Sequence, residues 1–335
     1  MSRKLLFNNV DKVNIGEIEH TYNHFMFDTS LIEGTTIELI RRSEDDYINR
    51  SGLTDWGDGT INRELSHTYA VDGTYEVKTK CVLGTRDALI SCLDMNREMR
   101  DLSGFFSDCI NLTYVNPNMD TSKVDRMTNM FYGCSSLKSL DLSGFNTSGV
   151  NRMENMFRNC SSLESLNISS FDVSKVQFMQ DMFRGCSSLK SLDLSSFDDN
   201  QVTDMSRMFR DCHSLESVNV SKLNTDSVFH MTQMFYNCYN LKSLDLSNFK
   251  CNSTFYRKHI DLSYMFGNCR KLELLNLSKW NLSGFEYDES KIYAENIINL
   301  KGIFADTYAL TLNNIIMTNC DEITISVITE AFNNK

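Results

Sequence analysis

This chain is poor in proline and in the cysteine spacings that bind metals. Pro117 is the single proline among 335 residues, and no two of the 11 cysteines form a Cys-x-x-Cys pair. The scarcity of proline excludes collagen-like and proline-rich sequences, and the missing pair argues against the common zinc and redox motifs. Positive charge is also in deficit. The formal net charge of −11 argues against general affinity for nucleic acids or anionic membranes.

Long hydrophobic runs are missing as well. No apolar stretch approaches the roughly 20 residues of a membrane helix, so we expect no direct membrane insertion. The first residues, MSRKLLFNNV, have a basic start but a very short apolar stretch. A secretory signal peptide needs a longer apolar core followed by a cleavage site with small residues. We therefore expect synthesis in the cytoplasm without a signal peptide.

What the chain does contain is one repeated cassette: Met-Phe, a cysteine three residues after the phenylalanine, and then Leu-x-x-Leu-x-Leu. From Phe131 to Phe235 the cassette recurs every 26 residues, which lies within the 20–29-residue range of leucine-rich repeats. The phenylalanines are Phe106, Phe131, Phe157, Phe183, Phe209, Phe235, Phe266 and Phe304. The cysteines are Cys109, Cys134, Cys160, Cys186, Cys212, Cys238 and Cys269.

Each repeat reads as one coil of a solenoid. The Leu-x-Leu alternation predicts a short strand with one face inward. The Met-x-x-Met-Phe pattern places apolar residues three and four apart, as on one face of a short helix. Glycine or asparagine usually stands two residues after the phenylalanine, where it is expected to end that helix in the left-handed conformation. Stacked coils would bury Leu, Met, Phe and Cys in one continuous core.

The cysteines in phase with the repeat could form disulfides, bind a metal or lie buried as free thiols. Their spacing of about 26 residues matches no metal motif. Thiols on adjacent coils point the same way, which suits a small buried apolar residue better than a bridge. We predict buried free thiols and no metal or cofactor.

The repeats resemble a known family. The segment VNRMENMFRNCSSLESLNISSFDVSKV (150–176) is similar to the BspA-type leucine-rich repeats of microbial surface proteins. The resemblance covers about residues 95 to 310 and rests on Met-Phe, Cys, Leu-x-x-Leu-x-Leu-Ser-x-Phe and Val-x-x-Met recurring in that order. It implies adhesion or partner binding on a surface, and it supplies no catalytic residues.

The N-terminal part lacks the repeat. Alternating apolar residues in FMFDTSLIEGTTIELIRR and TYEVKTKCVL predict strands, and Asp58-Gly59 predicts a tight turn. The combination Trp-Gly-Asp-Gly-Thr, His-Thr-Tyr and Gly-Thr-Tyr-x-Val resembles a PKD-like domain, an immunoglobulin-like sandwich that serves as a spacer or binding module. Asp55, Asp58 and the Glu-Asp-Asp at 44–46 lack the calcium-loop spacing, so we expect turn-forming aspartates. We expect His67 to make a structural hydrogen bond.

These patterns predict an α+β fold: an N-terminal β-sandwich followed by a leucine-rich-repeat solenoid of about eight coils, each a strand plus a short helix. The predicted domains are a PKD-like unit at 1–88 and a BspA-type solenoid at 89–335. Within the solenoid we expect an N-terminal cap at 89–105 and irregular coils at 249–335.

The outward strand positions carry small polar residues, a weak interface by itself. Lysine and glutamate alternate beside them from coil to coil, which we expect to fix the register by attraction. These residues are Lys138, Glu164, Lys190, Glu216, Lys242 and Glu273.

The residue after the phenylalanine is different, because arginine occupies it in three successive coils with tyrosine on both sides. This arginine stripe consists of Tyr132, Arg158, Arg184, Arg210 and Tyr236. Its composition is typical of protein interfaces, and the insertion at 249–260 adds Tyr256, Arg257 and Lys258. We predict that both bind a partner. Ion pairs of the arginines with Asp181 or Asp211 are the alternative.

No catalytic triad, phosphate-binding loop or carboxylate pair stands out from the repeats, so we predict that the protein is not an enzyme. We expect a binding or structural protein, an exposed component of a large assembly such as a phage virion. The alternative is a microbial cell-surface adhesin exported without a standard signal peptide. The expected partner is a protein or a surface glycan, not a nucleic acid.

Overall fold

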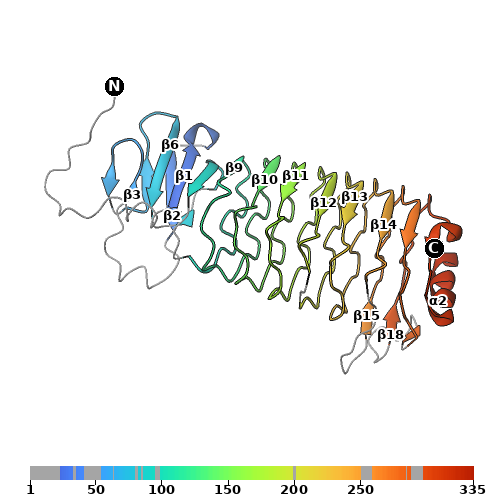
Figure 1. Cartoon of the computed structure of the whole chain (residues 1–335). Coiled ribbons are helices and arrows are strands. Elements are labelled where there is room, and N and C mark those ends of the chain that lie inside the picture. The colour runs from blue at the N-terminus through green and yellow to red at the C-terminus, as the bar shows by residue number, and fades with distance from the viewer. Residues whose placement is uncertain are drawn as a thin grey trace.

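The structure is a computed structural model that describes residues 23–32, 35–40, 54–62, 64–79, 82–83, 86–94, 99–198, 201–249, 259–283, 285–287 and 297–335. Figure 1 shows an elongated molecule with antiparallel strands at the N-terminal end, a long stack of coils, and helix α2 (Glu322–Asn333) at the other end. None of the described helices is long and apolar enough to cross a membrane.

The described residues of the N-terminal region form two sheets. The larger sheet has the order β4-β3-β6-β1-β8-β9, and the smaller one has the order β5-β2-β7. The strands are β1 (Asn23–Asp28), β2 (Thr36–Ile40), β3 (Thr54–Asp55), β4 (Ile61–Asn62), β5 (Ser66–Thr68), β6 (Thr74–Thr79), β7 (Val82–Leu83), β8 (Leu89–Asp94) and β9 (Tyr114–Val115). Alternate residues of β1, including Phe25 and Phe27, are fully buried, which is the pattern of a strand that has one face on a core.

The N-terminal region and the coils share a sheet. Strand β8 pairs antiparallel with β1 and parallel with β9, which is the strand of the first coil. Residues 89–105, predicted to form a cap of the solenoid, therefore contribute an inner strand to the N-terminal sheet.

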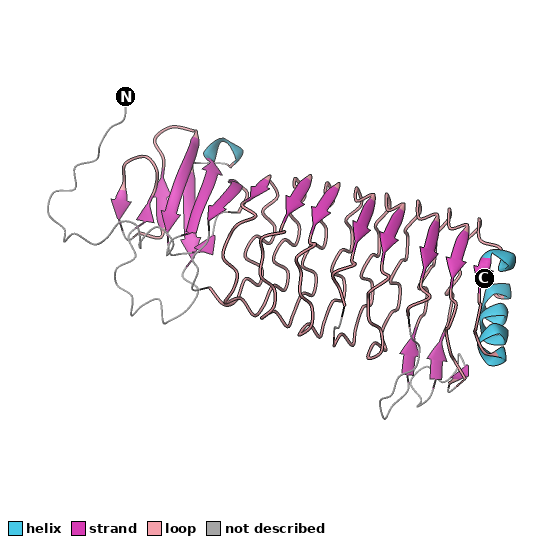
Figure 2. Ribbon diagram, in the orientation of Figure 1, coloured by secondary structure: helices cyan, strands magenta, loops and turns pink. Residues whose placement is uncertain are grey.

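Each following coil adds a short parallel strand to one face of the stack (Figure 2). Ser139 pairs with Ser165 and Ser191 pairs with Ser217, so equivalent residues lie in register 26 positions apart. These strands are β10 (Ser139–Asp141), β11 (Ser165–Asn167), β12 (Ser191–Asp193), β13 (Ser217–Asn219), β14 (Ser243–Asp245), β16 (Leu274–Asn276) and β19 (Ile315–Ile316). Three further strands pair at the C-terminal end of the stack: β15 (His259–Asp261), β17 (Glu286–Tyr287) and β18 (Ile297–Asn299).

The predicted α+β class, a sandwich joined to about eight strand-plus-helix coils, is wrong. The described residues form small strands in several sheets, and α2 is the one α-helix among them. The Met-x-x-Met-Phe segments are successive turns (Figure 2). The amide of Tyr132 donates to the carbonyl of Asn129, whereas the amide of Phe131 donates to Met156 of the next coil. Alternate amides thus leave the segment, so the hydrogen bonds of an α-helix cannot form.

Left-handed residues explain why a helix fails here. The expected left-handed residue after the phenylalanine is present, for example Gly133 with φ of 72° and Asn159 with φ of 62°. A second one lies four residues earlier, at Asn129 (57°) and Asn155 (55°). Two left-handed residues per segment interrupt any right-handed helix. The prediction placed the apolar residues correctly on one side but assigned them the wrong backbone.

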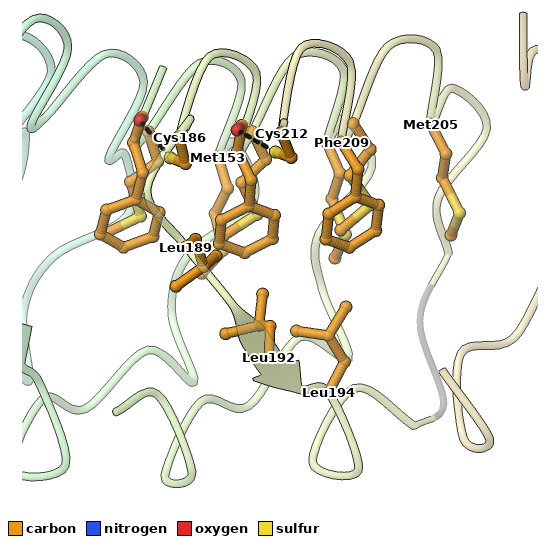
Figure 3. Close-up of a cluster of buried hydrophobic side chains, with 14 of the residues drawn as sticks. Met153, Cys186, Leu189, Leu192, Leu194, Met205, Phe209 and Cys212 are labelled. Carbon is orange, nitrogen blue, oxygen red and sulfur yellow. Dashed lines mark hydrogen bonds between the residues drawn. The ribbon is translucent and has the colours of Figure 1, made fainter. Parts of the chain in front are cut away.

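The core is built from stacked columns of identical residues. The rings of Phe131 and Phe157 are 5.7 Å apart with an interplanar angle of 4°, and those of Phe157 and Phe183 are 5.5 Å apart at 3°. Figure 3 shows Phe209, Met205 and Leu192 facing this interior, and the cassette methionines and leucines are buried with them, except Leu166, which is half-buried. At the C-terminal end α2 covers the stack and places Phe332 5.5 Å from the ring of Phe304.

The seven cassette cysteines are free and buried, as predicted. Each thiol from Cys134 onward donates to the carbonyl of the phenylalanine in the preceding coil, at Sγ–O distances of 3.0 to 3.2 Å (Figure 3). Burial raises the pKa of the Cys160 and Cys269 thiols to about 12. The cysteine therefore acts as a small core residue with one weak donor.

Candidate binding surface

The turn segment positions the arginine stripe. The phenylalanine and the cysteine on either side point into the core, so the residue that follows the phenylalanine faces outward. The side chains of Arg158, Arg184 and Arg210 are 29%, 24% and 26% exposed. Because the coils are stacked in register, these side chains form one row along the molecule.

Tyrosines close both ends of the row. The guanidinium carbon of Arg158 lies 5.7 Å from the ring centroid of Tyr132, and that of Arg210 lies 5.2 Å from the ring of Tyr236. Both distances are within the range of cation–π contacts. The next residue in the column is Gly267, where a Cβ would lie 2.8 Å from the Tyr236 ring. A side chain there would displace the tyrosine that ends the stripe.

Asp181 is the acidic centre of the stripe, and only 4% of its side chain is exposed. One of its oxygens lies 3.2 Å from Nη1 of Arg184, and the other lies 2.9 Å from Nη2 of Arg207. Arg158 is farther away, at 4.0 Å. Asp211 lies between Arg184 and Arg210, with N–O distances of 3.5 and 3.3 Å. The ion pairs considered as an alternative from the sequence are therefore present.

These ion pairs do not use all donors of the stripe. The Nε atoms of Arg158 and Arg210 are buried without a hydrogen-bond partner, although Nε of Arg210 lies 3.3 Å from Asp211 in poor alignment. Their Nη1 atoms donate to Asn155 and Gln233. Within the described ranges, no hydrogen bond starts from Nη2 of Arg158, Arg184 or Arg210. With Arg207, whose charge also interacts with Asp204, four arginines face three aspartates, which leaves one positive charge in excess.

The other predicted site residues, Tyr256, Arg257 and Lys258, lie outside the described residues, as do the Glu-Asp-Asp at 44–46 and most of the second insertion. Whether the insertion and the stripe act together stays a prediction.

The strand face offers neighbours of opposite charge or polarity. Nζ of Lys242 lies 2.8 Å from Glu216, which confirms the predicted attraction for this pair of coils. Nδ2 of Asn219 donates to Asp193 over 2.8 Å. These contacts link neighbouring coils across the strand face.

In the N-terminal sheets His67 has the structural role that was predicted. Its Nε2 lies 2.7 Å from Oδ2 of Asp58, and its ring stacks on Trp56 at 5.3 Å. Burial raises the pKa of Asp58, but hydrogen bonds from His67 and from the amide of Thr60 outweigh it and hold this pKa below its usual value. Across the described part of the chain, no group of three acidic, histidine or cysteine side chains is arranged to hold a metal ion.

One column of outward residues was missed from the sequence. It follows each cassette cysteine directly and contains serine in the central coils, but His213, Tyr239 and Arg270 in later ones. The signal was the change of residue type at one repeat position, which becomes visible when the cassettes are aligned on the cysteine.

Comparison with known proteins supports the repeat. The family described as "Mycoplasma protein of unknown function, DUF285" matches residues 100–217 and 187–301. These segments overlap and together span 100–301, more than half of the chain. No curated protein matches the sequence. Two overlapping matches to one family are what a repeated unit produces. The chain is thus a repeat protein and belongs to the DUF285 family.

Proposed function

We propose that this protein is a non-enzymatic binding protein and that the arginine stripe contacts an acidic partner. The observation that carries the proposal is the excess of arginine over aspartate in the stripe, on a chain with a net charge of −11. Arginine forks suit carboxylate and phosphate groups, and the Nη2 donors of the stripe are free to meet them. The flanking tyrosines add rigid contact area.

The setting of this binding rests on the resemblances. The BspA-type pattern of the coils and the PKD-like pattern of the N-terminal region both favour an exposed protein. We propose an outward component of a large assembly such as a phage virion, with the coils serving for attachment. The second candidate is an adhesin on a microbial cell surface.

Replacing the stripe arginines by lysine tests the binding role. The triple variant Arg158→Lys, Arg184→Lys, Arg210→Lys keeps the charges beside Asp181 and Asp211 but removes the planar forks. We expect partner capture or particle incorporation to fall roughly tenfold or more. The matched control replaces Ser139, Ser165 and Ser191 by lysine on the strand face. Binding that is lost in the control and kept in the arginine variant would show that the partner uses the strand face.

Mass spectrometry of purified particles and of membrane fractions separates the two settings. The virion proposal expects the chain in the particles, and the adhesin proposal expects it in the envelope of the cell.

A further inference from the structure

We propose a second binding surface, the C-terminal ladder, formed by His213, Tyr239, Arg270 and Tyr308, which takes an acidic segment of a protein partner. It lies in a different column from the arginine stripe and does not depend on the role proposed for the stripe.

The ladder occupies one position of the repeat. In the central coils the residue after the cysteine is Ser135, Ser161 or Ser187, which is small and polar. In the last coils the same position holds His213, Tyr239, Arg270 and Tyr308. In the coil of Tyr308, Thr307 stands in place of the cysteine. Serine suffices to build this corner of a coil, so folding alone does not require large aromatic and cationic side chains there.

Three of the four ladder side chains, those of His213, Tyr239 and Arg270, form a stack. The rings of His213 and Tyr239 are 4.7 Å apart with an interplanar angle of 5°. The guanidinium carbon of Arg270 lies 5.1 Å from the centroid of the Tyr239 ring. Nε of Arg270 donates to Oδ1 of Asn268 over 2.7 Å. This arrangement reduces the side-chain entropy that a partner would otherwise have to offset.

The exposed side chains of the ladder indicate a binding role in addition to a structural one. Stacking between coils accounts for the contact of His213 with Tyr239. It does not account for Tyr308, which is 72% exposed although its hydroxyl donates to Asp306. Arg270 and the adjacent Lys271 are also exposed. Tyrosine and arginine are the residues on which binding energy concentrates in protein interfaces.

The charges indicate the chemistry of the partner. Near the ladder, Asp306 accepts a hydrogen bond from Tyr308, and Glu216 interacts electrostatically with Lys271. Nε of Arg270 and Nζ of Lys271 are bound to the amide oxygens of Asn268 and Asn240, so neither cation is neutralised by these contacts. Carboxylates of a partner would complete them.

The stacking geometry favours a protein over a glycan or a nucleic acid. Sugars and bases bind aromatic residues through an open ring face, but both faces of Tyr239 are covered, by His213 and by Arg270. What remains accessible are the ring edge of Tyr239, the exposed ring of Tyr308 and the guanidinium donors of Arg270. Side chains of an acidic polypeptide can use all three.

The test uses the full chain and poly-L-glutamate as the probe. In the ladder variant Tyr239→Ser, Arg270→Ser, Tyr308→Ser, each residue becomes the one found at this position in the central coils. We expect the variant to bind the probe roughly tenfold or more weakly than the unchanged protein. A second variant, Arg270→Glu with Lys271→Glu, keeps the aromatic stack and should lose binding as well. The matched control is Ser135→Ala with Ser161→Ala, which should bind as the unchanged protein does.

Three results would overturn the ladder. They are equal binding by the ladder variant, equal binding by the charge-reversal variant, and a preference of the unchanged protein for heparin over poly-L-glutamate. The stripe variant with three lysines runs in parallel. Loss of binding in that variant alone assigns the probe to the stripe and rejects the ladder, whereas loss in the ladder variants alone supports the ladder whatever the fate of the stripe.

Discussion

The N-terminal sheets and the stacked coils are stabilised by contacts of different range. In the sheets Asn23 pairs with Thr79, and β1 lies between β6 and β8, which come from distant parts of the sequence. In the coils Ser139 pairs with Ser165, and each coil contacts the one before and the one after it. Loss of one strand therefore affects a whole sheet at the N-terminal end. Damage to one coil reaches two interfaces, as expected for repeat proteins.

The largest effect that we expect is the loss of stability at alkaline pH, where the coils should unfold before the N-terminal sheets. All seven cassette thiols have raised pKa values because they are buried. The unfolded chain loses these protons above a pH of about 8.5 and the folded chain keeps them. Stability therefore falls as the pH rises, by about 1.4 kcal/mol per thiol and pH unit. The described N-terminal sheets contain one buried free thiol, Cys92, and Tyr69, whose pKa burial raises from its ordinary value of 10, so we expect a smaller loss there than from the seven thiols of the coils.

Hydrogen exchange measured from pH 8 to 10 would follow both regions at once. Protection from exchange, taken relative to the intrinsic rate at each pH, should fall first at β10 to β14. If the N-terminal strands open at a lower pH than the coils, the thiols are not the cause. A variant with Cys160, Cys186 and Cys212 changed to alanine serves as the control and should show a shallower decrease.

Removing one buried ring from each region would show how far the damage spreads in the coils and in the sheets. Phe183→Ala and Phe25→Ala each take a fully buried ring from the core and should cost about 3–5 kcal/mol. The loss at Phe183 should accelerate exchange mainly in the coils around β12. The loss at Phe25 should affect β6 and β8 together, because both pair with β1. A cost below about 1 kcal/mol would show that the ring is not in the core.

The smallest effect that we expect is a loss of stability of the N-terminal sheets at acidic pH. Hydrogen bonds lower the pKa of Asp58, so its ion stabilises the N-terminal sheets above the ordinary pKa of about 3.9. That contribution is lost as the pH falls through the lower value of the folded state. Asp58→Asn should cost about 1 kcal/mol at neutral pH. It should also flatten the stability profile of the N-terminal sheets below a pH of about 4, as measured by urea unfolding. If the dependence of stability on acidic pH is unchanged in the variant, Asp58 does not contribute to it.

Local sequence patterns predicted the strands of the coils but not the turns between them. The Leu-x-Leu alternation marks β10 to β14 because a strand with one buried face imposes that period. The left-handed residues could be predicted only in part from the sequence. Asn129 and Asn155 tolerate this conformation, but Arg207 and Gln233 adopt φ of 57° in the same column. Their backbone is set by hydrogen bonds to the next coil, which no single repeat reveals.

The order of the arginine stripe was predictable from the sequence, and its ion pairs with Asp181 and Asp211 were the alternative considered there. The phase of the repeat placed Arg158, Arg184 and Arg210 in one row. The contact of Arg207 with Asp181 joins the same repeat position of neighbouring coils, 26 residues apart, so the phase of the repeat also placed these two residues side by side. The boundary predicted between residues 88 and 89 stays a prediction. Strand β8 begins at Leu89 and pairs with β1, so we expect a fragment of residues 1–84 to need this strand for a stable fold.

The hydrogen bonds between coils have a mechanical consequence. They run along the long axis of the stack (Figure 1), so a pull on the two ends of the chain loads the coil interfaces in series. The weakest interface opens first, and its opening relieves the tension on the others. Each coil that peels away releases 26 residues, or about 90 Å of extended chain. The stack would therefore lengthen stepwise under load, and the coils that remain closed would keep their surface intact.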